Sequence, residues 1–140
     1  MGEATEWWNR AVDERRAADA CRKQGLWVPC YQHAGQSLEF ALKAIFLRRN
    51  GHERMPAEYK GARWHRIGEI AELCRIESDL GGLKCDKDMW ANWLTAKTWN
   101  SNARFAGSKV SKDEVTELMV AAFNPAKGIF QWLEKIFQRS

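Results

Sequence analysis

The stretch from Cys30 to Ala44 separates apolar from polar side chains with the period of an α-helix. One stripe of this predicted helix carries the apolar residues Tyr31, Ala34, Leu38, Ala41, Leu42 and Ile45. The roughly opposite side carries the polar residues Gln32, Gln36, Glu39 and Lys43. The pattern predicts an amphipathic helix that packs one face on a core. On the outer face, Glu39 and Lys43 are expected to form an exposed i,i+4 ion pair that contributes only about 0.2–0.5 kcal/mol.

The rest of the chain predicts an all-α fold. A chain of 140 residues with three prolines and almost no alternating β-type runs favours one helical domain over residues 1–140. Start and stop signals place helices at about 5–23, 27–50, 65–78, 86–105 and 111–138, with a turn opening at Gly81 and Gly82. Four or five helices with short connections pack most simply as an antiparallel up-and-down bundle.

The predicted helix at 111–138 contains its own start signal and a break signal. Ser111 and Glu114 have the spacing of a capping box. The apolar stripe that follows keeps its phase across Asn124 and Pro125, which favours one kinked helix over two separate helices.

The composition indicates which kinds of partner and which cell compartment the chain is suited to. A net charge of +4 and a pI near 9.0 fit a nucleotide or nucleic-acid partner, although a solvated basic surface would look the same. No apolar run reaches the length of a membrane span, so we expect a cytoplasmic protein whose four cysteines are free and mostly buried. Cys30 and His33 are three residues apart, but no second pair completes a zinc set, so no metal site is expected.

Three segments follow one another in an order that resembles a known family. Residues 36–44 read Gln-Ser-Leu-Glu-Phe-Ala-Leu-Lys-Ala, residues 64–67 read Trp-His-Arg-Ile, and residues 99–105 read Trp-Asn-Ser-Asn-Ala-Arg-Phe. In order and spacing they resemble the second helix, the start of the third helix and the segment before the last helix of HEPN domains. These are small helical nucleotide-binding domains, in prokaryotes often encoded beside minimal nucleotidyltransferases. The resemblance covers about residues 27–138.

The resemblance implies a function and also shows a departure from the catalytic members of the family. It implies a homodimeric module that binds a nucleotide or RNA, or that pairs with a minimal nucleotidyltransferase in a toxin–antitoxin-like system. In HEPN ribonucleases, four to six intervening residues separate an arginine from a following histidine. Here no histidine follows Arg104, and the last histidine of the chain is His65.

We therefore expect a binding module without catalytic residues and without a cofactor, since RNA cleavage would lack a positioned general base. Two alternatives stay open. The first is a ribonuclease toxin with an atypical active site built from His65 and Arg104. The second is a helical interaction scaffold that binds no nucleotide.

Three polar sets are candidates for the nucleotide or RNA site. One set lies on the second helix and comprises Gln36, Glu39 and Lys43. Another lies on one line of the predicted helix 86–105 and comprises Lys97, Asn100 and Arg104. The third is the basic loop of Arg63, His65 and Arg66. The alternative for these cations is structural, with Arg104 paired to a carboxylate of the bundle and Lys97 reaching solvent.

Tryptophans mark a predicted dimer interface. The predicted helix 86–105 has apolar residues on two sides, including Trp90, Trp93 and Trp99. Apolar surface on two sides of one helix favours a central position or a subunit contact. We therefore expect a symmetric homodimer through this region.

Overall fold

The computed structural model describes residues 2–99 and 109–140. Every regular element in these ranges is a helix, which confirms the predicted all-α class. The elements are α1 (Glu3–Lys23), α2 (Trp27–Arg49), the 3-10 helix η1 (Ala62–His65), α3 (Ile67–Leu73), α4 (Glu77–Leu83), α5 (Lys87–Lys97), α6 (Lys112–Phe123) and α7 (Ile129–Gln138).

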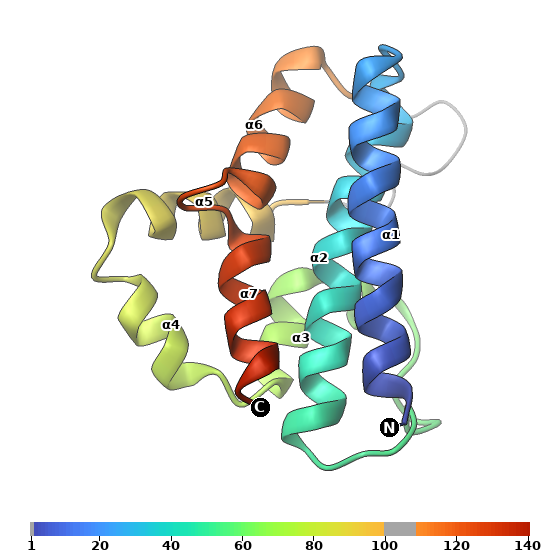
Figure 1. The fold of residues 1–140 in the computed structure, drawn as a ribbon, viewed down its shortest axis with the longest axis vertical. Coiled ribbons are helices and arrows are strands. Elements are labelled where there is room, and N and C mark those ends of the chain that lie inside the picture. Colours follow the sequence, from blue (N-terminus) through green and yellow to red (C-terminus); the bar gives the residue numbers. More distant parts are fainter. Residues whose placement is uncertain (1, 100–108) are drawn as a thin grey trace.

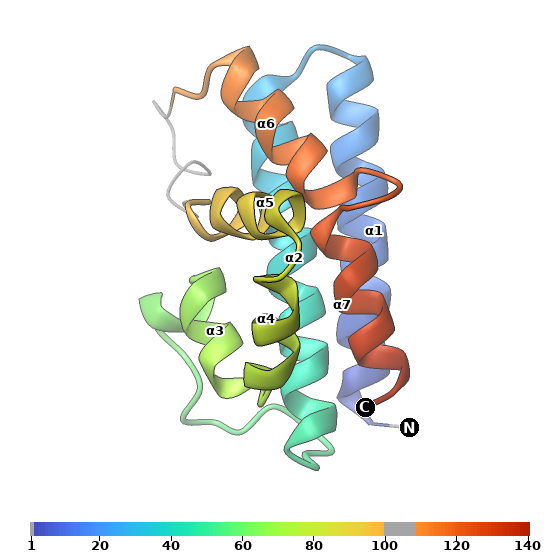
Figure 2. The ribbon, with the colours of Figure 1, turned by 90° about the vertical axis from the view of Figure 1, so that its left-hand side faces the viewer.

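Helix α2 is the centre of the bundle. It packs against α1 as an antiparallel pair and against α3, α6 and α7 on its other sides (Figure 1). Every residue from 41 to 47 is buried, as expected for a helix covered all round. The short helix α3 lies beside it, α4 lies farther out (Figure 1), and α5 runs across the long helices (Figure 2).

Small residues let α1 approach α2 closely. Ala4, Ala11 and Ala18 recur every seven residues along α1, and all three are buried. At their centre the Ser37 hydroxyl of α2 donates a hydrogen bond to the carbonyl oxygen of Ala11 at 2.7 Å. The inner face of α1 is therefore a stripe of alanines in contact with α2.

The segment from 62 to 83 departs from the predicted helix 65–78 and the predicted turn at Gly81. It forms η1, α3 and α4, because Arg75 adopts the left-handed backbone conformation (φ 59°) and separates α3 from α4. Helix α4 runs through Gly81 and Gly82, and burial of Leu83 anchors it to the core. The two glycines weaken this helix but do not break it.

Helix α5 ends well before the predicted residue 105. It starts as predicted after Asp86, whose carboxylate accepts hydrogen bonds from the N–H groups of Asp88 and Met89, each at 3.1 Å. It ends at Lys97, and Trp99 then turns back towards α2. The Trp99 indole donates a hydrogen bond to the carbonyl oxygen of Tyr31 at 3.1 Å, so a tertiary contact takes the place of another helical turn.

The predicted kinked helix 111–138 is wrong, because the chain forms two helices there. The capping box at Ser111 and Glu114 is present and starts α6. At Asn124 the backbone becomes extended, and the Asn124 side chain accepts hydrogen bonds from the N–H groups of Ala126 and Lys127. Pro125 has no N–H to continue the helix, so the asparagine side chain caps a turn instead.

The four cysteines are free, as predicted, and two of them are buried. Cys30 and Cys74 lie in the core, Cys21 is half-buried and Cys85 is exposed. Burial disfavours the thiolate, raising the pKa of Cys30 to about 11, and it also raises the pKa of Cys74. The buried thiols therefore act as small apolar side chains.

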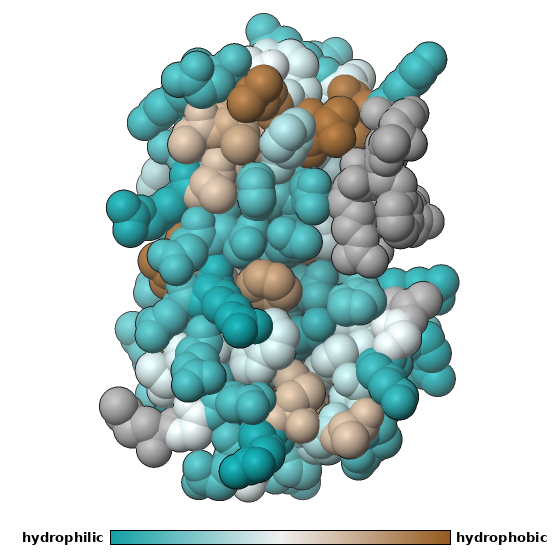
Figure 3. Space-filling model, turned by 90° about the vertical axis from the view of Figure 1, so that its right-hand side faces the viewer, coloured by the Kyte–Doolittle hydropathy of each residue, from teal (hydrophilic) through white to brown (hydrophobic). Residues whose placement is uncertain are grey.

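The surface is largely polar on the face formed by α1. Figure 3 shows this face as mainly hydrophilic, with hydrophobic residues gathered towards the end that carries the α1–α2 connection. Leu26, which is 51% exposed, belongs to this connection. Across residues 2–99 and 109–140, no helix has both the length and the apolar character that crossing a membrane requires.

Candidate functional site

The predicted pair of Glu39 and Lys43 forms, but it lies inside the protein. Lys43 Nζ donates a hydrogen bond to Glu39 Oε2 at 2.7 Å. Glu39 is only 3% exposed and Lys43 only 2%, so the prediction of an exposed pair is wrong. At Glu39 and Lys43 the polar side of α2 does not face solvent, because α1 and η1 cover it.

Aromatic rings surround the ammonium group of Lys43. Its Nζ lies 5.2 Å from the ring centroid of Trp7, 5.9 Å from that of Phe40 and 5.3 Å from that of Trp64. These distances suit cation–π attraction to rings from α1, α2 and η1. Burial nevertheless lowers the pKa of Lys43, because the cost of removing the charge from water outweighs the attraction of Glu39.

His65 joins the same pair, so the fold brings together three residues of the predicted sets. Its Nδ1 lies 3.1 Å from Glu39 Oε2, the oxygen that also accepts from Lys43. The His65 side chain is 35% exposed, whereas the carboxylate behind it is buried. The cluster therefore presents only the imidazole to solvent, and Lys43 is not accessible to a phosphate.

The other predicted binding residues lie around this cluster or outside the described residues. Gln36 is half-buried on α2, one turn before Glu39. The Lys97 side chain crosses the first turn of α3, where a Cβ atom added to Gly68 would lie 3.0 Å from Lys97 Cε. Asn100 and Arg104 lie outside the described residues.

The tryptophans of the predicted dimer interface have different environments. Trp93 is 2% exposed and packs edge-on against Trp132, and Trp99 is 5% exposed. Both are covered by their own chain and offer little surface to a second copy. Trp90 is partly exposed beside Lys84, so a dimer through this region stays a prediction that depends on Trp90.

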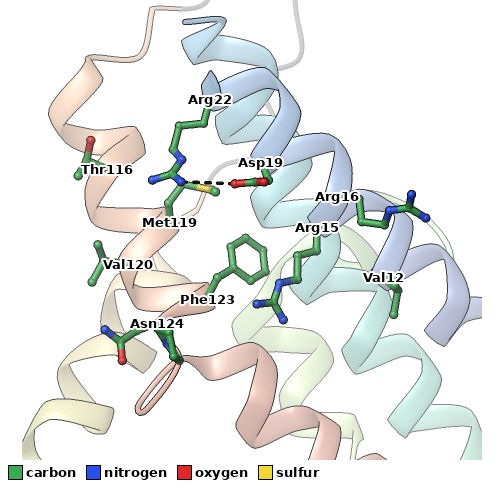
Figure 4. Close-up of a pocket in the computed structure, with 11 residues that line it drawn as sticks. Val12, Arg15, Arg16, Asp19, Arg22, Thr116, Met119, Val120, Phe123 and Asn124 are labelled. Carbon is green, nitrogen blue, oxygen red and sulfur yellow. Dashed lines mark hydrogen bonds and ion pairs between the residues drawn. The ribbon is translucent and has the colours of Figure 1, made fainter. Parts of the chain in front are cut away.

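A groove between α1 and α6 has a volume of about 650 Å³. We call it the arginine groove (Figure 4). It is lined by Val12, Arg15, Arg16, Asp19, Arg22, Thr116, Met119, Val120, Phe123, Asn124 and Pro125. Three arginines against one aspartate give the lining a net charge of +2. The groove exists because α1 and α6 both pack on α2 but diverge from each other.

The cations of the arginine groove differ in what they contact. The Arg15 guanidinium lies 5.0 Å from the centroid of the Phe123 ring and has no carboxylate partner in the described part of the chain. Arg22 instead pairs with Asp19 at 3.4 Å, and Asp19 also pairs with Lys23 at 3.1 Å. Figure 4 shows Arg15 and Arg22 extending towards α6 on either side of Phe123.

Arg16 also contributes to the lining, but its guanidinium points away from α6 in Figure 4. Of the three arginines, Arg15 is therefore the one that extends towards α6 without a carboxylate partner among the described residues. Hydrogen bonds from Lys23 and the neighbouring charges lower the pKa of Asp19, so this carboxylate is ionised at neutral pH.

Two arginines at the end of α2 hold helices together. Arg48 donates to the carbonyl oxygen of Phe137 at 3.0 Å, and Arg49 donates to that of Arg75 at 2.7 Å. Arg49 also pairs with Asp79 at 3.1 Å. These contacts fix the end of α2 to α4 and α7, which leaves the arginine groove as the stronger candidate for an anion.

Sequence reasoning missed the arginine groove, since its walls are about 100 residues apart in the chain. The signal that could have found it is the placement of Arg15, Asp19 and Arg22 on one face of α1, at i, i+4 and i+7. No pattern among neighbouring residues indicates that this face of α1 lies opposite Phe123. In comparisons with protein-family models, curated proteins and solved structures, the chain matches none.

Proposed function

We propose that this protein is a non-catalytic, HEPN-like helical module that binds a nucleotide or RNA, and that the arginine groove is its binding site. The observation that carries the proposal is the position of Arg15, which has no carboxylate partner in the described residues and lies beside an aromatic ring. A guanidinium fork suits two parallel hydrogen bonds to phosphate, and Phe123 offers a face for a base.

The size of the groove supports the same ligand. Small-molecule sites usually have volumes of about 300–1,000 Å³ and combine apolar walls with a few polar groups. The arginine groove, at about 650 Å³, has walls of Val12, Met119 and Val120 with the arginines at its edge. Pairing with a nucleotidyltransferase stays a prediction of the HEPN resemblance.

Removal of the Arg15 charge is expected to weaken phosphate binding. Isothermal titration calorimetry would use AMP, CMP, GMP, UMP and a uridine hexanucleotide as probes. Because a hydrogen bond to a charged group contributes about 1.5–3 kcal/mol, Arg15→Gln should raise the Kd about tenfold or more. Added salt should also weaken binding.

Arg16→Gln is the matched control, because it removes the same charge from the next residue of α1. Its guanidinium points away from α6, so the Kd should change by less than about threefold. Equal losses in both variants would show that only diffuse charge matters. If none of the probes binds wild type, the proposal is wrong.

One contact favours a second candidate, a ribonuclease that uses His65. A carboxylate on Nδ1 orients an imidazole for proton transfer, and Glu39 occupies that position. The imidazole is partly exposed, as a general base must be.

We expect no RNA cleavage, since the Arg-to-His spacing of HEPN ribonucleases is absent from the chain. A mixed RNA pool would be incubated with wild type, with His65→Ala, and with His52→Ala as a matched histidine control. Cleavage that is lost in His65→Ala and kept in His52→Ala would contradict the proposed binding module and support a ribonuclease.

A further inference from the structure

The carboxylate of Asp19 divides the arginine groove into two ends with different chemistry. At one end, Arg15 has free donors beside Phe123. At the other end, Arg22 and Lys23 are already paired with Asp19. An anion is therefore attracted most strongly at the Arg15 end, whereas the Asp19 end offers an acceptor to a neutral hydroxyl group.

This arrangement is unsuited to a nucleic-acid strand. A strand that followed α1 from Arg15 towards Arg22 would place one of its phosphates next to an ionised carboxylate. Proteins that bind strands without sequence preference line the path of the backbone with cations, and a carboxylate in that path repels it.

The same arrangement matches one nucleotide. Arg15 and Asp19 lie one turn apart on the same face of α1, about 6 Å along the helix axis. That separation is comparable with the distance between the 5′-phosphate and the ribose hydroxyls of a single nucleotide. Phe123, drawn between Arg15 and Asp19 in Figure 4, provides an aromatic face for the base.

We infer that the arginine groove binds a single ribonucleoside 5′-phosphate, with the phosphate on Arg15, the base against Phe123 and the 2′- and 3′-hydroxyls donating to Asp19. The inference rests on the proposed function and adds the class of ligand. An ionised carboxylate accepts strong hydrogen bonds from a vicinal diol, so Asp19 would select ribose over a sugar that lacks both hydroxyls.

The test compares four ribonucleoside 5′-monophosphates (AMP, CMP, GMP and UMP) with their 2′,3′-dideoxy counterparts by isothermal titration calorimetry. For wild type, we expect the best-bound ribonucleotide to bind about tenfold or more tightly than its dideoxy form. Asp19→Ala should bring this ratio close to one, whatever it does to the absolute affinity. The ratio is the chosen readout because Asp19→Ala also frees Arg22, which can strengthen phosphate binding.

Asp13→Ala is the matched control, since Asp13 is an exposed aspartate of α1 that lies outside the groove. It changes the net charge equally and should leave the ratio unchanged. Thermal melts of both variants should stay close to wild type, because alanine is well tolerated in helices. The ion pairs of Asp19, whose side chain is 46% exposed, also contribute little.

The failure of this inference is distinguishable from failure of the proposed function. Equal binding of ribo and dideoxy forms, lost in Arg15→Gln, would overturn the ribose assignment and keep the phosphate site. A uridine hexanucleotide that binds far more tightly than UMP would also overturn the inference, in favour of a strand. If no probe binds wild type, both proposals fail together.

Discussion

Replacement of Lys43 by alanine is expected to lower the free energy of unfolding by about 3–5 kcal/mol. Lys43 is 2% exposed and its ammonium group donates to Glu39 Oε2 at 2.7 Å, so its removal leaves a buried carboxylate whose other partner in the described part of the chain is His65. The three aromatic rings around Lys43 would lose their cation as well. Urea denaturation followed by tryptophan fluorescence would measure the change.

The control for this prediction is a pair with the same chemistry on the surface. Lys23 and Asp19 also form an i,i+4 ion pair, at 3.1 Å, but the Lys23 side chain is 70% exposed. Lys23→Ala should change the free energy of unfolding by less than about 1 kcal/mol. A double replacement, Glu39→Leu with Lys43→Met, should recover much of the loss, because similar apolar side chains often replace a buried pair at little cost.

A loss for Lys43→Ala as small as that for Lys23→Ala would contradict the buried pair. In both pairs a lysine follows its carboxylate partner by four residues, so burial is the main variable that separates the two sites. A double variant as unstable as Lys43→Ala would show that the lost packing, rather than the stranded charge, dominates.

Gly35→Ala is expected to destabilise the protein by about 1–3 kcal/mol or more. A Cβ atom at this position would lie 1.9 Å from an atom of the Trp99 ring, well inside contact distance. Trp99 is 5% exposed and is tied to the Tyr31 carbonyl oxygen, so it has little room to retreat. Chemical denaturation of the variant would measure the loss.

Gly81→Ala is the same substitution, but it is expected to raise the free energy of unfolding. Gly81 lies within α4, and nothing surrounds its would-be Cβ within 4 Å. Alanine should therefore stabilise the helix by about 0.5–1 kcal/mol, since glycine in a helix interior is unfavourable by that amount. Stabilisation by both substitutions would refute the close packing of Trp99 on Gly35.

Local signals in the sequence determined the fold class and several helix ends. The capping box at Ser111 starts α6 because its hydrogen bonds join residues three apart and need no tertiary partner. The bounds of α2 follow from the helical period and from the stop signal at Asn50 and Gly51. Such features depend on neighbouring residues alone, so the sequence suffices to predict them.

A local signal decided one helix break, and a tertiary contact decided another. The stripe of apolar residues keeps its phase through Asn124, yet the Asn124 side chain caps a turn with the N–H groups of Ala126 and Lys127, so this break depends on neighbouring residues. Helix α5 stops at Lys97 because Trp99 finds a partner at Gly35, a residue more than sixty positions away. Periodicity does not reveal such a partner.

Tertiary packing also decided how exposed each candidate site residue is. The sequence alone determined that Glu39 and Lys43 would face each other one turn apart, and it determined that Arg15, Asp19 and Arg22 would share a face of α1. Only the packing of α1 and η1 over α2 buried the first set, and only the divergence of α1 from α6 left the second set open beside Phe123. The physical reason is that spacing fixes which side chains share a face, whereas the helices packed against that face decide its contact with water.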